Sequence, residues 1–283
     1  MNVVAAWFFA EAGALRPRAQ KPGARLGLLV LGLVFLGAVL TLVGNPLTPL
    51  LTDPSSAHQP PSRDHWFGTD HLGRDIGWRL MWATRTFVGP GLLAAGTSVG
   101  LGAMLGLASG ADTRFAPMTR LVTSTVASIP PPVWVLLLAS IHGSDWWVIA
   151  SAFGIANAPA VAMAVHRRVQ GLVRTDFVDG LVLAGLNPYR VLFVHLLLYA
   201  SARLLIREGV LAFGGFLAVD AGLAYLGGSG VREPNPSWGN MLAFEWGRGG
   251  HPLVSIAPIL CLVLTLAALH RTAALFADVR VDS

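Results

Sequence analysis

The stretch His166–Leu198 reads HRRVQGLVRTDFVDGLVLAGLNPYRVLFVHLLL, and it decides how the rest of the chain is interpreted. Long uncharged runs precede it and a further apolar stretch begins at its end, whereas the stretch itself carries repeated charges. This pattern is typical of a basic loop that connects two membrane spans on the cytoplasmic side. A helix in such a loop could bind a cytoplasmic partner protein. A solvated connector without a partner has the same pattern.

Two short helices are expected within this loop. The first runs over about 175–184, with Thr175 or Asp176 as its N-cap and Gly185 as the glycine that ends it. The second begins at Asn187-Pro188, because asparagine is a good N-cap and proline in the first helical position loses no needed N–H.

The composition indicates an integral membrane protein. Hydrophobic residues make up 54% of the chain and charged residues only 12%, whereas a soluble domain has roughly 25% charged residues. The 283 residues fit one polytopic domain. The cations mostly flank apolar runs, where membrane topology explains them, so they do not indicate a nucleic-acid partner.

The chain lacks the residues for several kinds of chemistry. Its one cysteine, Cys261, lies in an apolar run, so neither an intrachain disulfide nor a cysteine-rich metal site can form. Its one lysine, Lys21, is followed by proline, so no P-loop can be written. We therefore expect no cofactor on this chain, and any ATP chemistry must come from another chain.

The apolar stretches predict six membrane spans, at Leu26–Val43, Thr86–Ala111, Leu121–Ser140, Trp146–Val165, Leu196–Leu226 and Pro252–Leu269. Four cations precede the first span, at Arg16, Arg18, Lys21 and Arg25. The positive-inside rule therefore predicts that both chain ends are cytoplasmic.

The domain organisation follows from these spans. Residues 1–24 form an N-terminal tail, in which 1–15 are a tail or an interfacial helix, and residues 277–283 form a C-terminal tail. Residues 25–85 hold the first transmembrane helix and an extracytoplasmic segment. Residues 86–276 form a five-helix core that contains the loop 166–198.

Two parts of this model make specific structural predictions. In the segment after the first span, an amphipathic helix starts at about Leu72, with Ile76 and Leu80 near the membrane and Arg74 and Arg79 toward water or headgroups. In the second span, small residues recur at four-residue spacing, which favours close approach of a neighbouring helix. The glycines at this spacing are Gly96, Gly100, Gly102 and Gly106.

The later spans contain prolines and charges. Pro130, Pro131 and Pro132 must kink or interrupt the third span, which suits a helix that lines a pathway but also a bent packing helix. A helix that begins at Pro188 and runs through the fifth stretch is longer than a bilayer needs, so its first turns are expected to project into the cytoplasm. The charges in this stretch that belong to the candidate pathway are Arg207, Glu208 and Asp220.

A second extracytoplasmic loop, 227–252, is rich in glycine and proline and is expected to be full of turns. Its Trp238 and Trp246 are candidate anchors at the membrane interface. His65 and His71 lie near several aspartates, but their spacing is not that of a ligand pair, so we expect no metal site.

Three motifs in order resemble one family. Phe67–Asp75, FGTDHLGRD, closely resembles the signature of the second permease subunit of dipeptide/oligopeptide/nickel-type ABC importers. Asp220–Asn240, DAGLAYLGGSGVREPNPSWGN, is similar to that family's segment ending in P-S-W-G-N. Asp176–Gly185, DFVDGLVLAG, with His195 following, is similar to its cytoplasmic EAA loop.

The resemblance implies a type I ABC importer permease fold of six transmembrane helices in the inner membrane of a bacterium. It implies that the EAA-like loop is a coupling helix that fits a groove on an ATPase subunit. The residues expected to couple are Asp176, Phe177, Asp179, Gly180, Gly185, Asn187 and Pro188. Gly180, Leu181 and Leu198 stand where the family has alanine, alanine and proline, so this loop departs from the family pattern at three positions.

The resemblance also implies the partners and the division of labour. This chain would be half of a translocation pore for dipeptides, oligopeptides or nickel complexes, and not itself an enzyme. Its partners would be a homologous permease, two ATP-binding subunits that hold ATP and Mg²⁺, an extracytoplasmic solute-binding protein and membrane lipid.

The extracytoplasmic motif has two interpretations, a structural brace or a contact for the binding protein or substrate. Asp70 or Asp75 could cap a turn or pair with Arg74, because Gly-Thr-Asp is ordinary turn chemistry. The residues of this motif are Gly68, Thr69, Asp70, Leu72, Gly73, Arg74 and Asp75, and those of the second loop are Pro236, Ser237, Trp238, Gly239 and Asn240.

Other functions remain open from the sequence alone. Asp220 could pair with Arg232, contact a partner subunit or bind the amine of a peptide. A stand-alone ion- or proton-coupled carrier would use the same intramembrane charges, and a membrane-bound enzyme would use the extracytoplasmic histidines.

Overall fold

The computed structural model describes residues 22–43, 50–111, 114, 116–173, 175–227, 231, 233–245 and 251–277. In these residues the regular structure is helical, apart from one isolated bridge between Thr69 and Asp75, as the sequence predicted. The helices are α2 (Pro22–Val43), η2 (Pro54–Ser56), α3 (Ile76–Ala111), α4 (Ala116–Ala127), α5 (Pro131–His142), α6 (Trp146–Val173), α7 (Asp176–Leu183), α8 (Pro188–Arg190), η3 (Val191–Tyr199), α9 (Ala202–Tyr225), α10 (Trp238–Glu245) and α11 (Pro252–Leu275).

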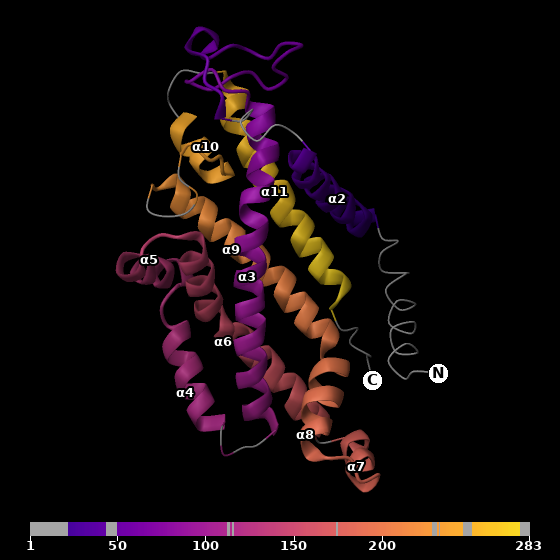
Figure 1. The fold of residues 1–283 in the computed structure, drawn as a ribbon. Coiled ribbons are helices and arrows are strands. Elements are labelled where there is room, and N and C mark those ends of the chain that lie inside the picture. The colour runs from indigo at the N-terminus through magenta and orange to yellow at the C-terminus, as the bar shows by residue number, and fades with distance from the viewer. Residues whose placement is uncertain are drawn as a thin grey trace.

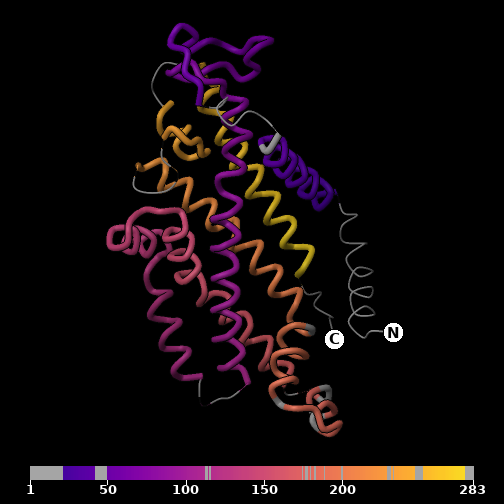
Figure 2. Tube along the Cα trace, viewed as in Figure 1, coloured from indigo at the N-terminus to yellow at the C-terminus, as the bar shows by residue number. Residues whose placement is uncertain are grey.

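The long helix α3 runs through the middle of the bundle, and the other elements are arranged around it (Figure 1). Segment 50–75 and α10 lie at one end, which we call the α10 end, and α7 and α8 lie at the opposite end, which we call the α7 end. The same path of the chain can be followed in Figure 2.

Helix α6 packs closely along α3 at two of the predicted small residues. A Cβ on Gly102 would lie 2.7 Å from the carbonyl oxygen of Ala158, and one on Gly106 would lie 2.6 Å from that of Ala162. A Cβ on Gly96 or Gly100 would meet nothing within 4 Å. The prediction of close approach is therefore right for the second pair and wrong for the first, because only the second pair faces α6.

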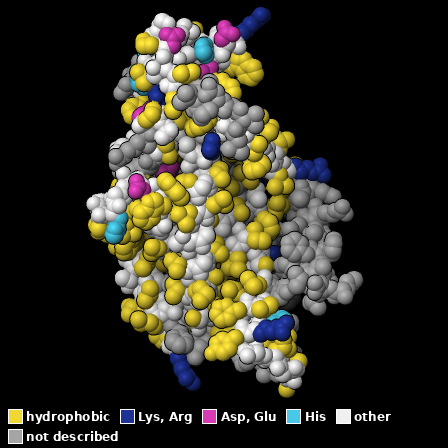
Figure 3. Space-filling model, in the orientation of Figure 1, with side chains coloured by type: hydrophobic (Ala, Val, Ile, Leu, Met, Phe, Trp, Pro, Cys, Tyr) yellow, Lys and Arg dark blue, Asp and Glu magenta, His cyan; other side chains and the backbone are white. Residues whose placement is uncertain are grey.

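Among the described residues, four helices are long and apolar enough to cross a membrane, namely α2, α3, α6 and α11. The pair α4 and α5 makes a fifth span if it is counted as one, but it is bent by 81°. Pro130 precedes α5 and Pro131 starts it, so the predicted interruption of this span is confirmed. Hydrophobic side chains cover most of the middle of the face in Figure 3.

The start of α3 differs from the sequence prediction. The helix begins at Ile76 instead of about Leu72, and it continues to Ala111 without a break, so it includes both the predicted amphipathic helix and the second span. Arg74 and Arg79 do not point to water, since both are buried and Arg79 is only 1% exposed. Residues 233–241 pack over this part of the chain and supply partners for both cations.

The fifth stretch also differs, because no single helix runs on from Pro188. The three-residue α8 leads into the π-helix η3, and a break at Ala200-Ser201 precedes α9. The Ser201 hydroxyl donates to the carbonyl of Leu196 at 2.7 Å. Helix α9 packs against α3, α6 and α11, so its charged side chains enter the bundle with it.

The second loop contains a helix, α10, that the turn-rich pattern did not predict. Trp238 begins it and is 4% exposed, with its indole N–H donating to the carbonyl of Leu80 at 3.3 Å. The prediction that Trp238 anchors the protein at a membrane interface is therefore wrong. Trp246 and the predicted tail segment 1–15 lie outside the described residues.

Candidate functional site

At the α10 end, the motif 67–75 folds into a tight turn that needs its glycines. Gly68 and Gly73 have φ of 80° and 73°, values that residues with a Cβ rarely adopt. A Cβ on Gly73 would also lie 1.8 Å from the carbonyl oxygen of Asp53. The Thr69 hydroxyl accepts the N–H of Gln59 at 2.9 Å, which joins the turn to the segment before it.

Both aspartates of the motif order the backbone. Oδ1 of Asp70 accepts the N–H of Leu72 at 2.8 Å and that of Arg74 at 2.9 Å. Oδ1 of Asp75 accepts the N–H of Trp78 at 2.8 Å, so Asp75 caps the N-terminus of α3. The motif therefore ends where the central helix begins.

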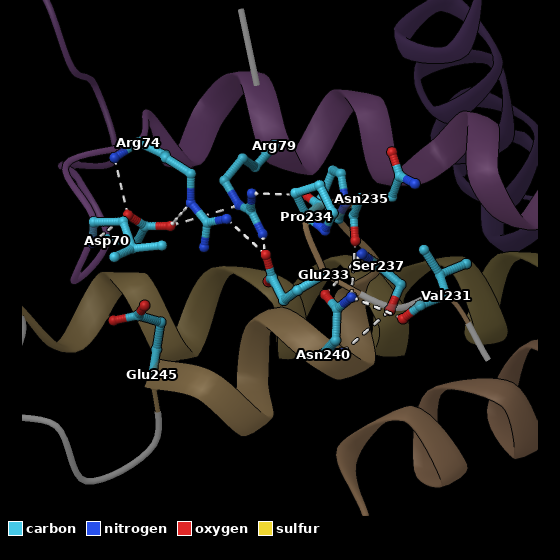
Figure 4. A network of polar contacts seen from close by, with 12 residues as sticks. Asp70, Arg74, Arg79, Val231, Glu233, Pro234, Asn235, Ser237, Asn240 and Glu245 are labelled. Carbon is cyan, nitrogen blue, oxygen red and sulfur yellow. Dashed lines mark hydrogen bonds and ion pairs between the residues drawn. The ribbon is translucent and has the colours of Figure 1, made fainter. Parts of the chain in front are cut away.

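Four side chains near this turn form an ion network, which we call the clasp: Asp70, Arg74, Arg79 and Glu233 (Figure 4). The first three are buried, and the side chain of Glu233 is 24% exposed. Nε of Arg74 lies 2.5 Å from Asp70, and its Nη1 lies 2.6 Å from Glu233. Nη2 of Arg79 lies 2.8 Å from the other oxygen of Glu233. The clasp therefore joins the motif to the second loop across more than 150 positions of sequence.

The electrostatics of the clasp are balanced, with two guanidinium groups and two carboxylates. Burial lowers the pKa of Arg74, but the hydrogen bond that Arg74 donates to Glu233 and the charge of Asp70 outweigh this effect, so that its pKa is raised overall. Arg74 is therefore held as a cation, which is the form that its two carboxylate partners require.

The loop 231–240 that presents Glu233 is fixed by its own residues. The Asn240 carboxamide oxygen accepts the N–H of Ser237 at 2.8 Å, and the Ser237 hydroxyl accepts the N–H of Asn240 at 3.1 Å. Nδ2 of Asn240 donates to the carbonyls of Val231 and Asn235, both at 2.9 Å.

Neighbouring residues hold this loop against the bundle. The Pro236 carbonyl accepts the hydroxyl of Thr86, on α3, at 3.2 Å. A Cβ on Gly239 would lie 2.3 Å from the carbonyl oxygen of Ala221, so only glycine allows α10 to approach α9 this closely. The P-S-W-G-N residues therefore contact both α3 and α9.

Beside the clasp, Nδ1 of His71 lies 2.5 Å from Glu245, whose carboxylate is buried. Ligand atoms of Asp70, His71 and Glu245 all lie within 4.8 Å of one another, which is close enough to hold a cation. The oxygens of Asp70 already accept two backbone N–H groups and the guanidinium of Arg74, so we assign no metal to this cluster.

At the α7 end lie residues 176–190, which comprise α7 and α8 and which we call the coupling segment after the role that the sequence predicts for it. This segment has the predicted turn. Gly185 has φ of 75°, and the N–H of Leu186 donates to the carbonyl of Leu181 at 3.2 Å, as in a Schellman motif. The Asn187 side chain accepts the N–H of Tyr189 at 2.9 Å, which confirms it as a cap. Thr175 is not a side-chain cap, because its hydroxyl donates to the carbonyl of Leu172 instead.

The coupling segment projects from the bundle with apolar side chains in the open. Leu183 is 88% exposed and Tyr189 is 73% exposed. A Cβ on Gly180 would meet nothing within 4 Å. The side chains of Asp176, Phe177, Asp179 and Pro188 lie outside what the structure describes.

One side chain links this segment to the bundle. The Arg168 guanidinium, on α6, donates to the carbonyl of Ala200 at 3.1 and 3.3 Å. This carbonyl lies at the end of η3, directly before α9. Arg168 therefore connects α6 to the junction through which the coupling segment continues into α9.

The candidate pathway residues are not brought together. Arg207 and Glu208 form an ion pair at 2.6 Å, whereas Asp220 is buried about 20 Å further along α9. Pro130 and Pro131 lie at the bend between α4 and α5. Arg232, the candidate partner of Asp220, lies outside the described residues.

Sequence reasoning missed several residues of these sites. Glu233, Glu245 and Arg168 were not singled out, and Arg79 was assigned to water. The sequence signal that could have identified these residues was a charged side chain next to apolar residues, in a chain that has few charges. Each of the two glutamates finds its partner more than 150 positions away, where local patterns give no information.

Comparison with known proteins agrees with the motifs. The family model for the inner membrane component of binding-protein-dependent transport systems matches residues 98–278. The "Probable peptide ABC transporter permease protein" of Sinorhizobium fredii is 31% identical over 223 residues, which cover 78% of this chain and 76% of that protein. The "Dipeptide transport system permease protein" of Alkalihalophilus pseudofirmus is 28% identical over 219 residues, which cover 77% and 71%.

The matched region contains the second part of α3 and every described element from α4 to α11. The relatives carry the family name that the three motifs suggested. The sequence-based resemblance is therefore confirmed, and the chain belongs to the family of binding-protein-dependent transport system inner membrane components.

Proposed function

We propose that this chain is the permease subunit of an ATP-driven, binding-protein-dependent importer of peptides, in which it forms half of the translocation pore. The names of its relatives, which refer to peptide and dipeptide transport, support the substrate class. Nickel complexes are a less supported cargo, because neither of these names mentions them. ATP is hydrolysed by separate subunits, and this chain performs no catalytic step.

The observation that carries the proposal is the projecting coupling segment. Leu183 and Tyr189 are exposed at the α7 end of the bundle, and apolar side chains in that position are expected to be covered by a partner. The Gly185 turn sets the direction of α7 relative to α8, which follows it. An ATP-binding subunit with a groove for α7 fits this surface.

The coupling segment is connected to the membrane spans in a way that can transmit a displacement to them. Displacement of α7 acts through α8 and η3 on the start of α9, and through the bond from Arg168 to Ala200 on α6. Helix α6 packs along α3 at Gly102 and Gly106, so the three helices are expected to move together. Shifting the pore from 1:99 to 99:1 between two states takes about 5.5 kcal/mol of differential binding.

The α10 end is assigned to the extracytoplasmic side and both chain ends to the cytoplasm of a bacterium, with six spans in the inner membrane. The first four spans are α2, α3, the bent pair α4–α5, and α6. Helix α9 is the fifth although it carries charges, since it packs between other helices, and α11 is the sixth.

In this assignment the clasp is a brace that holds the extracytoplasmic turn on α3. Its four charges face one another and three of them are buried, which leaves them few atoms for a ligand. The solute-binding protein is expected to dock on the exposed part of segment 50–75. A homologous permease and membrane lipid complete the surroundings of the chain.

A stand-alone carrier that uses Asp220 is the second candidate from the sequence. The separation of Asp220 from Arg207 and Glu208 along α9 gives the carrier hypothesis little support. Membership of a family that works with a binding protein also argues against it.

The test is purification of the tagged chain from detergent-solubilised native membranes, followed by mass spectrometry. The wild-type chain is expected to recover a second permease and P-loop ATPases. Gly185→Val should lose the ATPases and keep the second permease, because a β-branched residue is strained at positive φ.

Gly185→Asn is the matched control, because asparagine tolerates this conformation, and it should retain both partners. Recovery of the folded chain without any partner would contradict the proposal. Full retention of the ATPases by Gly185→Val would remove α7 from the contact.

A further inference from the structure

A cavity of about 230 Å³ lies at the α7 end of the bundle, between α3, α4 and α6. Ser109 contributes to it from the last turn of α3, Arg120 and Ser124 from α4, and His166 and Arg167 from α6. The cavity lies apart from the clasp and from the exposed side chains of the coupling segment, and the proposed function does not use it.

The lining of this cavity suits an anion. It includes two guanidinium groups, Arg120 and Arg167, and none of its lining residues is acidic. His166 is fixed there, because its Nδ1 lies 3.0 Å from the hydroxyl of Ser109. Glu208 interacts with Arg167 but forms its ion pair with Arg207, and it does not line the cavity.

Hydroxyl groups of α4 add polarity to the lining. Thr119, Thr123 and Ser124 line the cavity from this helix. The Thr123 hydroxyl donates to the carbonyl of Thr119 at 2.8 Å and that of Ser124 to the carbonyl of Leu121 at 3.0 Å. The donors for phosphate oxygens are therefore the guanidinium groups that converge from α4 and α6, each of which supplies paired N–H groups.

The position of the cavity indicates where such a phosphate comes from. His166 lies 20 residues after Trp146 on α6, which is about 30 Å along a helix and the thickness of a hydrocarbon core. Trp146 is exposed at the other end of α6. The cavity therefore lies at the level of lipid headgroups in the leaflet at the α7 end.

The surface around the cavity suits acyl chains. Met118, Leu121 and Val122 of α4 are exposed, as is Met163, which also lines the cavity. Of the residues of α4, only Thr123 is buried. At this depth these side chains face acyl chains, so a phospholipid can place its headgroup in the cavity and its tails on the adjoining apolar surface.

We propose that this cavity binds the phosphate group of an anionic phospholipid, such as phosphatidylglycerol, from the leaflet at the α7 end. Basic pockets between helices on the cytoplasmic side are suited to acidic headgroups, and each cation near the surface contributes about 1 kcal/mol. The bound lipid neutralises Arg120 and Arg167 and fills the space between α4 and α6. It thereby fixes the helix that precedes the bend to the helix that leads into the coupling segment.

The experiment uses the full complex released from nanodiscs that contain phosphatidylglycerol and phosphatidylcholine with identical acyl chains, and native mass spectrometry counts the lipids retained. Wild type should retain phosphatidylglycerol in preference to phosphatidylcholine. The double variant Arg120→Gln/Arg167→Gln should bind it about 20- to 30-fold more weakly, since 1 kcal/mol is about fivefold per cation. Arg25→Gln, an exposed cation at the start of α2, is the matched control and should bind like wild type.

A variant that keeps every charge guards against misfolding of the double variant. Ser124→Trp fills the cavity and should also lose the lipid. Unchanged retention of phosphatidylglycerol in both variants would overturn the proposal. Displacement of the lipid by millimolar inorganic phosphate would assign the site to a soluble phosphate. Binding of the lipid by the separated chain but not by the complex would show that the partner permease covers this face. Either result would also overturn the proposal.

Discussion

The guanidinium of Arg74 lies 2.5 Å from the carboxylate of Asp70, four residues earlier, and both side chains are buried. The same guanidinium reaches Glu233 at 2.6 Å. This one cation therefore holds together the turn in which it lies and a loop from the other half of the chain. An ion pair in this position is required mainly because neither charge can remain buried alone.

Asp70→Asn should destabilise the protein by about 3–5 kcal/mol, because it leaves Arg74 and Arg79 with a single carboxylate inside the protein. Urea or thermal unfolding in detergent would measure the loss. Asp64→Asn, at an exposed position nearby, is the matched control and should change stability by less than about 0.5 kcal/mol. Equal stability of the two variants would contradict a structural role for the clasp.

Leu183→Asp should weaken binding of the ATPase subunits about 10- to 100-fold, because a buried leucine contributes about 1.5–3 kcal/mol. The side chain is 88% exposed in the isolated chain, so stability should not change. Titration of purified ATPase against the permease would measure the affinity. Trp66→Asp, at an exposed apolar residue of the α10 end, should leave it unaffected.

Arg168→Met should uncouple ATP hydrolysis from transport while the ATPases stay bound. The substitution removes the two donors that hold the Ala200 carbonyl at the junction of η3 and α9. The peptide taken up per ATP hydrolysed, measured in proteoliposomes, should fall several-fold. Arg168→Lys keeps one donor and should recover part of the coupling, and an unchanged ratio in Arg168→Met would exclude this route of transmission.

Gly106→Ala should destabilise the bundle by about 1–3 kcal/mol, because its Cβ would lie 2.6 Å from the carbonyl oxygen of Ala162 and force α3 and α6 apart. The same substitution at Gly100 meets nothing within 4 Å and should be neutral or stabilising by up to about 1 kcal/mol. The two unfolding curves, measured in the same detergent, test the orientation of α3. The opposite order would mean that another face of α3 contacts α6.

Features that depend on local chemistry were predictable from the sequence. Gly185 and Asn187-Pro188 mark the ends of short helices through conformational preferences that hold in any protein, and the structure has these turns. The interruption at Pro130-Pro131 follows from the missing N–H of proline in the same way. The helical class follows from the length of the apolar stretches.

Features that depend on distant contacts were not predictable. Arg79 looks like a water-facing cation until Glu233 is brought to it, and Trp238 looks like an interface residue until the carbonyl of Leu80 accepts its N–H. The glycines of α3 have one spacing throughout, but only Gly102 and Gly106 meet α6. In each case the neighbour lies more than 50 positions away, and the local pattern is the same with or without it.

The clasp also crosses the boundary of the region that this chain shares with its whole family. Glu233 lies within the matched residues 98–278, whereas Asp70, Arg74 and Arg79 precede them. A chimera that exchanges residues 1–97 between two such permeases therefore transplants three charges and leaves the fourth behind. Such an exchange should keep the clasp where the recipient supplies an acidic residue at the position of Glu233, or where the loop around Glu233 is exchanged together with the turn.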